Sequence, residues 1–273
     1  MNQSLSIGRI FGIDVRVHAT WLLAFAFVTW GLGSGYFRFV IPRQQGLVVP
    51  LIFGAVAALS LFASVLIHEL SHSLVAQARG MRVRDITLFI FGGVSNILDD
   101  VKSAQDEFVV SAVGPLTSFA LAGLFWAIGH SLNLPSPIDV FFGTSVRALR
   151  AMSPSAALLT YLTAINLILG TFNLVPAFPL DGGRVFRSIV WGITHRYGRA
   201  TLIASIIGQL FGLVMVGLGV VRIFYGDVFG GIWTILIGSF LIQSAGAARG
   251  WRQRENQSTN QASALAGMVP RRP

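Results

Sequence analysis

Two histidines four residues apart, His68 and His72, form the motif His-Glu-x-x-His with Glu69 between them. On an α-helix, residues i and i+4 lie on one face, so both imidazoles can point at a single ion. Zinc suits this ligand set because neutral imidazole binds it and a coordination position is left for water. The ion lowers the pKa of that water from about 15.7 to about 7. Glu69 would take the proton and later pass it to a leaving amine, so we predict that it is catalytic.

The alternative to a metal site is a hydrated cluster of polar residues at a helix end. However, the motif directly follows the apolar run 59–67. Ionisable groups at membrane depth cost about 2.5–3.5 kcal/mol each. Three such groups within five residues need a compensating partner, and a metal ion provides one. The sequence context therefore favours the metal site.

The composition is that of an integral membrane protein. Of 273 residues, 53% are hydrophobic and only 11% are charged, whereas soluble domains carry about 25% charge. The net charge of +9 would suit a nucleic-acid-binding protein, but the basic residues lie in the gaps between apolar runs. We therefore exclude nucleic acid and interpret the charge as a signal of topology and contact with a lipid bilayer. Without cysteine the chain has neither disulfides nor thiolate chemistry.

Six apolar runs are long enough to be membrane spans. They cover residues 19–39, 47–78, 108–128, 156–172, 201–221 and 228–245. Six spans place both termini on one side, and grouping Lys and Arg by connection gives 15 on that side against 5 on the other. By the positive-inside rule, both termini are cytoplasmic, and so is the His-Glu-x-x-His motif. We expect a multi-pass protein of a prokaryotic inner membrane.

Two segments differ from these helical runs. Residues 4–18 alternate weakly between apolar and polar, which predicts a short β element at the membrane surface. Residues 83–98 are β-branched and aromatic and are too short to cross the bilayer as a helix. Gly92-Gly93 near their middle is a turn signal, so we predict a re-entrant β-hairpin covered by protein. The expected fold class is an all-α polytopic protein with six transmembrane helices, this hairpin and the short N-terminal β element.

The domain organisation predicted from these patterns is simple. Residues 1–248 would form one membrane domain, and the polar residues 249–273 would form a disordered tail. Residues 130–154 contain several prolines and are predicted to form a long loop.

A catalytic zinc usually has three protein ligands, so the histidine pair needs one more. Asp181 follows an apolar span, precedes Gly182-Gly183 and belongs to the same predicted side of the membrane. Asp-Gly-Gly alone is typical of a turn, but the pairing with the histidine motif favours a metal ligand. Asn173 could donate a hydrogen bond to a developing oxyanion or simply cap a helix, and its sequence context leaves both roles open.

The histidine motif and a second motif far downstream together resemble the site-2 protease family of intramembrane zinc metalloproteases. The second motif is the run Asn-Leu-Val-Pro-Ala-Phe-Pro-Leu-Asp-Gly that starts at Asn173. The resemblance implies that one Zn2+ per chain is bound by His68, His72 and Asp181, with Glu69 activating water. It extends over residues 4–245 and matches the six-span form without PDZ or CBS domains.

The segment Phe91-Gly92-Gly93-Val94 is similar to the re-entrant hairpin of that family, which implies that Gly92, Gly93 and Val94 bind substrate. The family's activity is cleavage of a transmembrane substrate protein, within the bilayer, in regulated intramembrane proteolysis. Two alternatives are a membrane-anchored zinc protease with a glutamate as third ligand, and a metal-binding transporter or inactive scaffold. Asp181 in its Leu-Asp-Gly context argues against the first, and the absence of an internal repeat argues against a transporter.

Overall fold

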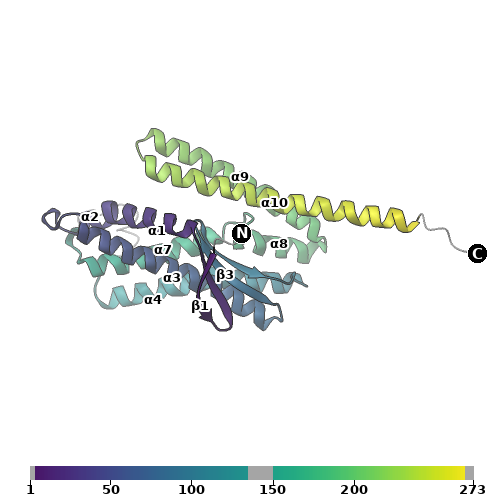
Figure 1. The fold of residues 1–273 in the computed structure, drawn as a ribbon, viewed down its shortest axis with the longest axis horizontal. Coiled ribbons are helices and arrows are strands. Elements are labelled where there is room, and N and C mark those ends of the chain that lie inside the picture. Colours follow the sequence, from purple (N-terminus) through teal and green to yellow (C-terminus); the bar gives the residue numbers. More distant parts are fainter. Residues whose placement is uncertain (1–3, 135–149, 268–273) are drawn as a thin grey trace, which may run out of the picture. The chain divides into compact units, whose positions relative to one another are not determined.

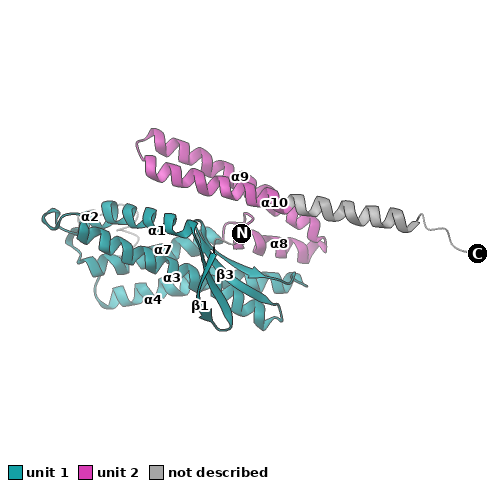
Figure 2. Ribbon diagram, viewed as in Figure 1, with its two compact units in different colours: residues 1–173 teal, residues 174–273 magenta. Residues whose placement is uncertain are grey.

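The structure is a computed structural model that describes residues 4–134 and 150–267, with side chains described up to residue 248. Two compact units divide the chain at residue 173, and Figure 2 colours them separately. The single membrane domain predicted for residues 1–248 and the separate tail 249–273 stay predictions. Most of the predicted loop 130–154 lies outside the described residues.

The first unit combines helices with a small sheet (Figure 1). Its elements, in chain order, are β1 (Ser4–Ile10), β2 (Ile13–His18), α1 (Thr20–Gly31), the π-helical turn η1 (Leu32–Tyr36), α2 (Phe37–Val40), the 3-10 turn η2 (Arg43–Gln45), α3 (Val48–Ala78), β3 (Val83–Phe89), β4 (Gly92–Ile97), α4 (Ala104–Ser131) and α7 (Pro154–Asn173). At a rise of about 1.5 Å per residue, α3 is about 46 Å long, which exceeds the roughly 30 Å of the hydrocarbon core.

The second unit contains the helices α8 (Asp181–Thr194), α9 (Tyr197–Phe224) and α10 (Val228–Gly267). Helices α9 and α10 pack closely because glycines meet across their interface. A Cβ on Gly212 would lie 2.7 Å from the Gly238 carbonyl oxygen, and one on Gly219 would lie 2.7 Å from the Gly231 carbonyl oxygen. Small residues allow this close approach of two membrane helices.

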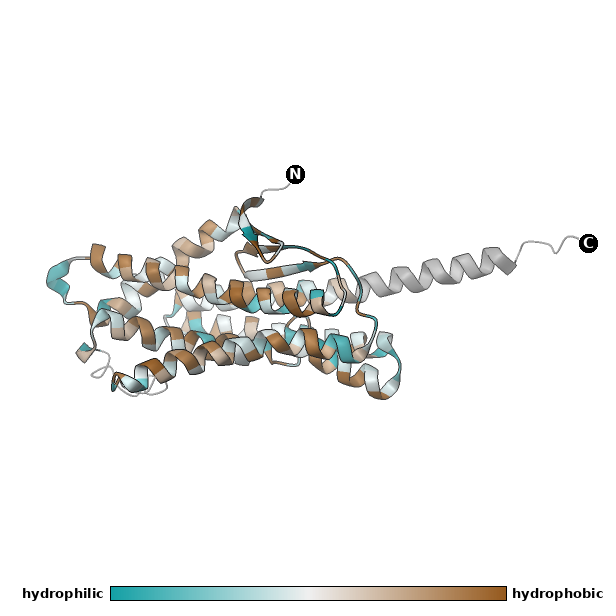
Figure 3. Ribbon diagram, turned by 90° about the horizontal axis from the view of Figure 1, so that it is seen from below, coloured by the Kyte–Doolittle hydropathy of each residue, from teal (hydrophilic) through white to brown (hydrophobic). Residues whose placement is uncertain are grey.

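Five helices of the described chain are long and apolar enough to cross a membrane. They are Val48–Ala78, Ala104–Ser131, Pro154–Asn173, Tyr197–Phe224 and Val228–Ala248. Hydrophobic residues dominate these helical ribbons in Figure 3. The chain is therefore an integral membrane protein, as its composition predicts.

The first predicted span, residues 19–39, is helical but divided into α1, η1 and α2, so it is not one of these five helices. The division coincides with the glycine-rich part of the span. A Cβ on Gly33 would lie 2.9 Å from the Leu51 Cα of α3, and one on Gly54 of α3 would lie 2.5 Å from the Thr29 carbonyl oxygen. Close packing of α3 against this glycine-rich segment accompanies the local widening to a π turn.

The predicted all-α class with two separate β elements needs correction. The two hairpins form one four-stranded sheet in the order β1-β2-β3-β4. Strands β2 and β3 pair in parallel, with Val15 opposite Ile86, and both side chains are buried. Burial of these two apolar side chains supports a pairing between segments about 70 residues apart, which local sequence patterns do not reveal.

The turn of the second hairpin also differs from the prediction. It lies at residues 90–91, and Gly92-Gly93 are instead the first two residues of β4. Gly92 has a positive φ of 129°, a conformation that glycine adopts without strain. The glycines therefore shape the start of β4 rather than the turn.

The end of α3 is joined to the start of α4 by an ion pair. Arg79 Nη1 lies 2.6 Å from Asp106 Oδ1. The Ser103 side chain caps α4 by accepting a hydrogen bond from the Asp106 backbone N–H at 3.0 Å. The ion pair thus connects the ends of the two helices that carry the histidines and their hydrogen-bond partners, and the cap stabilises the start of α4.

Candidate metal centre

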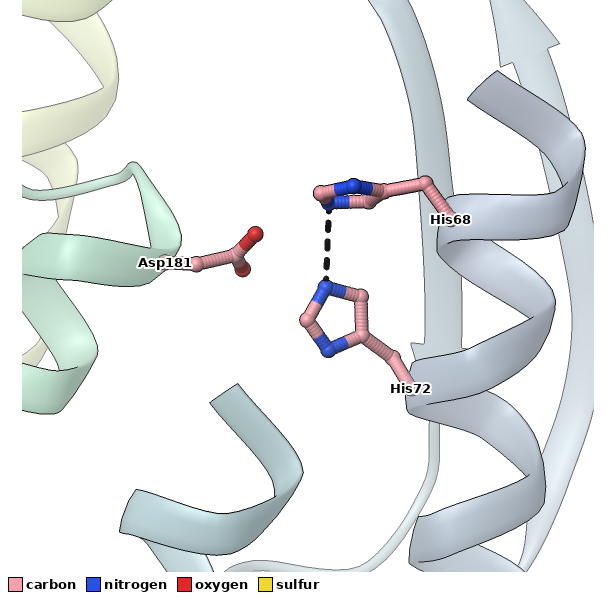
Figure 4. Close-up of side chains that lie close together, drawn as sticks. All are labelled: His68, His72 and Asp181. Atoms are coloured by element: carbon pink, nitrogen blue, oxygen red, sulfur yellow. Dashed lines mark hydrogen bonds between the residues drawn. The ribbon is translucent and has the colours of Figure 1, made fainter. Parts of the chain in front are cut away.

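Helix α3 brings the two histidines of the motif together on its buried face. The imidazoles of His68 and His72 project from successive turns, and their exposed fractions are 2% and 5% (Figure 4). Their Nε2 atoms lie 3.2 Å apart. The prediction that both rings share one face of a helix is confirmed.

Each histidine has a hydrogen-bond partner on α4 for its other ring nitrogen. His68 Nδ1 lies 2.9 Å from Ser118 Oγ, and His72 Nδ1 lies 2.5 Å from the Val110 carbonyl oxygen. A carbonyl only accepts, so His72 donates from Nδ1 and its neutral ring has a lone pair on Nε2. That lone pair points at the facing ring, where either a proton or a metal cation must lie between the two nitrogens.

The spacing of the rings fits a metal ion of the size and geometry of zinc. Two nitrogens bound to tetrahedral zinc at about 2.0–2.1 Å are about 3.3 Å apart. The observed Nε2 separation of 3.2 Å agrees with this value. Hydrogen bonds from the far nitrogens to oxygen acceptors are also what metal-binding histidines usually make, because they fix the ring and its tautomer.

Gly114 of α4 lies directly against the two Nε2 atoms. A Cβ on Gly114 would overlap His72 Nε2 and would lie 2.6 Å from His68 Nε2. Only glycine leaves this space free. The residue after it, Pro115, also lies inside α4. Gly114 thus forms one wall of the candidate metal centre.

The Glu69 side chain contacts strand β4 of the sheet, whereas the two histidines contact α4. Its Oε2 accepts a hydrogen bond from Ser95 Oγ of β4 at 2.9 Å. A Cβ on Gly93 would lie 2.6 Å from Glu69 Cγ. Strand β4 therefore makes room for the glutamate side chain and also holds one of its carboxylate oxygens.

The three residues predicted to bind substrate, Gly92, Gly93 and Val94, open strand β4. This strand is at the edge of the sheet in the described chain, because its only partner there is β3. Val94 is 44% exposed and points away from the face that carries Gly93. Their role toward substrate stays a prediction.

Asn173 is the last residue of α7. Its Nδ2 donates to the Leu169 carbonyl oxygen at 2.9 Å, which is a contact within the final turn of the helix. An amide nitrogen carries two protons, and this contact uses one. The structure thus shows the helix-end contact, and the predicted hydrogen bond to an oxyanion stays a prediction.

Asp181 is the first residue of α8, where the helix dipole favours a negative charge. The loop before it is held by close packing of glycines. A Cβ on Gly182 would lie 2.5 Å from the Val175 carbonyl oxygen, and one on Gly183 would lie 2.5 Å from the Ala177 carbonyl carbon. These contacts allow no side chain at either position, so the turn that presents Asp181 is specified by backbone packing.

Arg187 supports the same loop from the next turn of α8. Its guanidinium lies over the rings of Phe178 and Tyr197, at 5.3 Å and 4.9 Å from their centroids. Such cation–π contacts contribute about 0.5–2 kcal/mol each. The segment between α7 and α8 is therefore restrained both by its backbone and by this side chain.

The first unit offers the His68 and His72 imidazoles as candidate metal ligands, and the second unit offers the Asp181 carboxylate. Two imidazoles and one carboxylate are a donor set of the kind found in catalytic zinc sites. The sequence predicts all three of these residues as ligands, and that role stays a prediction. Sequence reasoning did not identify Ser118, Gly114 or Ser95, because their contacts with His68, His72 and Glu69 come from other elements of the fold.

The five apolar helices are those of an integral membrane protein. The His-Glu-x-x-His motif on α3, with its two imidazoles side by side, is typical of a metalloprotease. A sequence model of Peptidase family M50 matches residues 56–215, more than half of the chain. The chain belongs to Peptidase family M50, and its resemblance to the site-2 proteases is confirmed.

Individual relatives agree with this assignment. A Synechocystis protein, whose name places it among zinc metalloproteases, is 40% identical over 91% of this chain and 60% of its own length. A zinc metalloprotease of Methanocaldococcus jannaschii is 35% identical over 80% of this chain and 55% of its own length. The solved structure of the site-2 protease from that organism superposes with a TM-score of 0.61 at 30% identity, covering 90% of this chain and 95% of the solved one. The chain thus spans between 55% and 60% of the length of these two curated relatives.

Proposed function

We propose that this chain is an intramembrane zinc endopeptidase that hydrolyses a peptide bond in a transmembrane segment of a substrate protein. The observation that carries the proposal is the buried His68–His72 pair, with its Nε2 atoms 3.2 Å apart on a 31-residue apolar helix. A polar pair of this kind at membrane depth is costly unless it serves a function. Membership of Peptidase family M50 supports the same reaction.

Zinc would be held by His68, His72 and Asp181, one ion per chain. The donor chemistry of the three side chains supports this assignment, as do the hydrogen bonds of both Nδ1 atoms. When bound, zinc supplies a Lewis acid that acidifies water and polarises the scissile carbonyl. Asp181 is the ligand that links the histidine motif to the downstream motif.

Glu69 would move the proton in the reaction. It lies next to His68 on α3, and its Oε2 is held by Ser95. The carboxylate takes a proton from the attacking water and returns it to the leaving amine. Asn173 would use its second amide proton to stabilise the oxyanion, since only one is used in the contact with Leu169.

The substrate would be a membrane segment that has lost its helical hydrogen bonds. A transmembrane helix hides its carbonyls in its own hydrogen bonds, so it must unwind locally before hydrolysis. The outer edge of β4, which begins at Gly92-Gly93-Val94, offers backbone groups that can bind an extended segment as an added strand. We propose that these residues bind the substrate and that the β3–β4 hairpin is re-entrant.

The topology we propose has six spans with both termini in the cytoplasm of a prokaryotic cell. Residues 20–40 are helical throughout α1, η1 and α2, which supports a first span in addition to the five long helices. The basic residues divide 15 against 5 between the two sides on this topology.

The test uses the full chain, purified in detergent and loaded with zinc, with a transmembrane peptide as substrate. Glu69→Gln keeps the metal ligands and should lower turnover by about 10²–10⁴-fold. Asp181→Ala should lower the zinc content instead. Zinc is measured by atomic absorption and cleavage by mass spectrometry of the products.

Two results would contradict the proposal. If Glu69→Gln cleaves as fast as the unaltered chain, Glu69 is not the base. If the chain binds zinc but cleaves no membrane peptide, a transporter or an inactive scaffold becomes the better description. Substrates that co-purify with the Glu69→Gln variant would provide the peptides to try first.

A further inference from the structure

We infer that Ser95 is a positioning residue for Glu69 and that Ser73 in turn orients Ser95. The inference deepens the proposed function and rests on it, because it assigns how the catalytic carboxylate is held. Ser95 lies on β4, 26 residues after Glu69 in the chain. The sequence motif gives no indication of such a partner.

The three side chains form a short chain of hydrogen bonds. Ser73 Oγ donates to Ser95 Oγ at 3.1 Å, and Ser95 Oγ donates to Glu69 Oε2 at 2.9 Å. Glu69 and Ser73 are one helical turn apart on α3, so both face the same part of β4. The Ser73 side chain is fully buried, which restricts the directions in which its hydroxyl can donate.

The face of β4 toward α3 is adapted to the glutamate at two successive positions. Residues 93 and 95 point to the same side of a strand. Gly93 leaves space for the Glu69 side chain, since a Cβ there would lie 2.6 Å from Glu69 Cγ. Ser95 then supplies the hydrogen-bond donor, so the strand both admits the side chain and restrains its end.

The chemistry of a hydroxyl donor suits a catalytic base. A hydrogen bond to Oε2 leaves Oε1 available to accept a proton from water. A hydroxyl is neutral, so it orients the carboxylate without forming an ion pair that would weaken it as a base. Misplacement of a reacting group by about 1 Å can reduce the rate by about 10²-fold, so orientation alone has a large effect.

A purely structural role for Ser95 is the competing explanation. Its Oγ also lies 3.0 Å from the Glu69 backbone carbonyl oxygen, and a single hydroxyl proton can be donated to only one of the two acceptors at a time. In that case Ser95 would only attach β4 to α3. The two roles differ in whether the effect of Ser95 depends on the side chain of residue 69.

A double-mutant cycle on thermal stability separates the two roles without any need for activity. The variants are Ser95→Ala, Glu69→Ala and the double variant of the full chain. We expect Ser95→Ala to lower the melting temperature when residue 69 is Glu and to have little effect when it is Ala. Equal losses in both backgrounds would show that Ser95 donates to the backbone carbonyl, and would overturn the inference.

Kinetics on the zinc-loaded enzyme give the second measurement. We expect Ser95→Ala to lower kcat by about 10- to 100-fold with KM within about twofold. Ser95→Thr, which keeps the hydroxyl, should restore most of kcat, and Ser73→Ala should cause a smaller loss than Ser95→Ala. A kcat for Ser95→Ala equal to that of the unaltered enzyme would overturn the inference.

Ser60→Ala is the matched control on α3. The Ser60 hydroxyl donates to the Val56 carbonyl oxygen within its own helix and is solvent- or lipid-exposed. This variant should leave kcat, KM and zinc content unchanged. If the unaltered chain shows no cleavage but the stability cycle shows coupling, the proposed function fails while the Ser95–Glu69 contact stands.

Discussion

The two units of the chain present their candidate metal ligands by different means. In the first unit, His68 and His72 extend from the C-terminal third of a long helix. Each ring is oriented by a hydrogen bond, His68 to Ser118 and His72 to the Val110 carbonyl. In the second unit, Asp181 starts a helix after a loop in which glycines pack directly against backbone atoms.

The difference shows which changes each unit can tolerate. The helix stays folded when one side-chain hydrogen bond is lost. Loss of such a bond should therefore weaken metal binding by the histidines without moving them away from the site. The loop before Asp181 tolerates less change, because its glycines pack against backbone atoms and an added methyl group would have to move the chain. Gly114 is the exception in the first unit, since its contact is with the rings themselves.

The largest effect is expected from Gly114→Ala. The new Cβ would overlap His72 Nε2 and lie 2.6 Å from His68 Nε2, the two atoms proposed to bind the metal. We expect zinc affinity to fall by more than about 100-fold, beyond the 10- to 100-fold loss typical of a change in a ligand's partner. Competition with a zinc chelator measures the affinity.

Gly123→Ala on the same helix is the matched control for this prediction. Nothing lies within 4 Å of a Cβ at Gly123. Alanine is the better helix former by about 1 kcal/mol, so this variant should keep its zinc and be no less stable. Normal zinc binding by Gly114→Ala would show that the rings do not bind metal at their Nε2 atoms.

The next effect is expected from Gly183→Ala in the second unit. A Cβ there would lie 2.5 Å from the Ala177 carbonyl carbon and 2.7 Å from Phe178 Cα, so the start of α8 must shift. We expect a loss of about 10- to 100-fold in zinc affinity together with a lower melting temperature. Gly217→Ala on α9, where nothing lies within 4 Å of a Cβ, is the control. Unchanged zinc affinity would mean that the position of Asp181 does not depend on this packing.

Ser118→Ala should have a smaller effect, because it removes a hydrogen bond and adds no atoms. His68 Nδ1 would lose its partner at 2.9 Å, and the ring would be less well oriented. We expect about a 10-fold loss in zinc affinity. Thr117→Val, whose hydroxyl donates only to the Val113 carbonyl in its own helix, should have no effect. An equal loss in both variants would point to general destabilisation of α4.

The smallest effect is expected on stability, at the Arg82–Asp99 ion pair, which lies before α4 and does not include a candidate metal ligand. The Arg82 side chain and backbone hydrogen bonds lower the pKa of Asp99 to about 2. A lowered pKa in the folded state stabilises the fold at pH values above the unfolded value of about 3.9, and this contribution is lost as the pH falls toward 2. Asp99→Asn should therefore be slightly less stable than the unaltered chain at pH 5 and equal to it near pH 2. A stability difference that does not change between these pH values would contradict this assignment.

The helices were predictable because their apolar runs are long and continuous. The predicted run 47–78 corresponds to α3, Val48–Ala78, and the run 156–172 corresponds to α7, Pro154–Asn173. The division of residues 19–39 was not predictable to the same degree, since it accompanies the contact of Gly33 with α3. Likewise, the parallel pairing of Val15 with Ile86 joins two hairpins that each look independent in the sequence.

The sequence by itself predicted the candidate ligands and the base, because the spacing His68-Glu69-x-x-His72 puts both imidazoles on one face of a helix and Asp181 lies in a second recognisable motif. Only the tertiary structure decided what surrounds them: Gly114 against the ring nitrogens, Ser118 on His68, and Ser95 on Glu69. The physical reason is that ligand spacing follows from the period of one helix, whereas the partners that orient a ligand come from other elements. Those partners are fixed by how α4 and β4 pack against α3, and this packing has no short-range pattern in the chain.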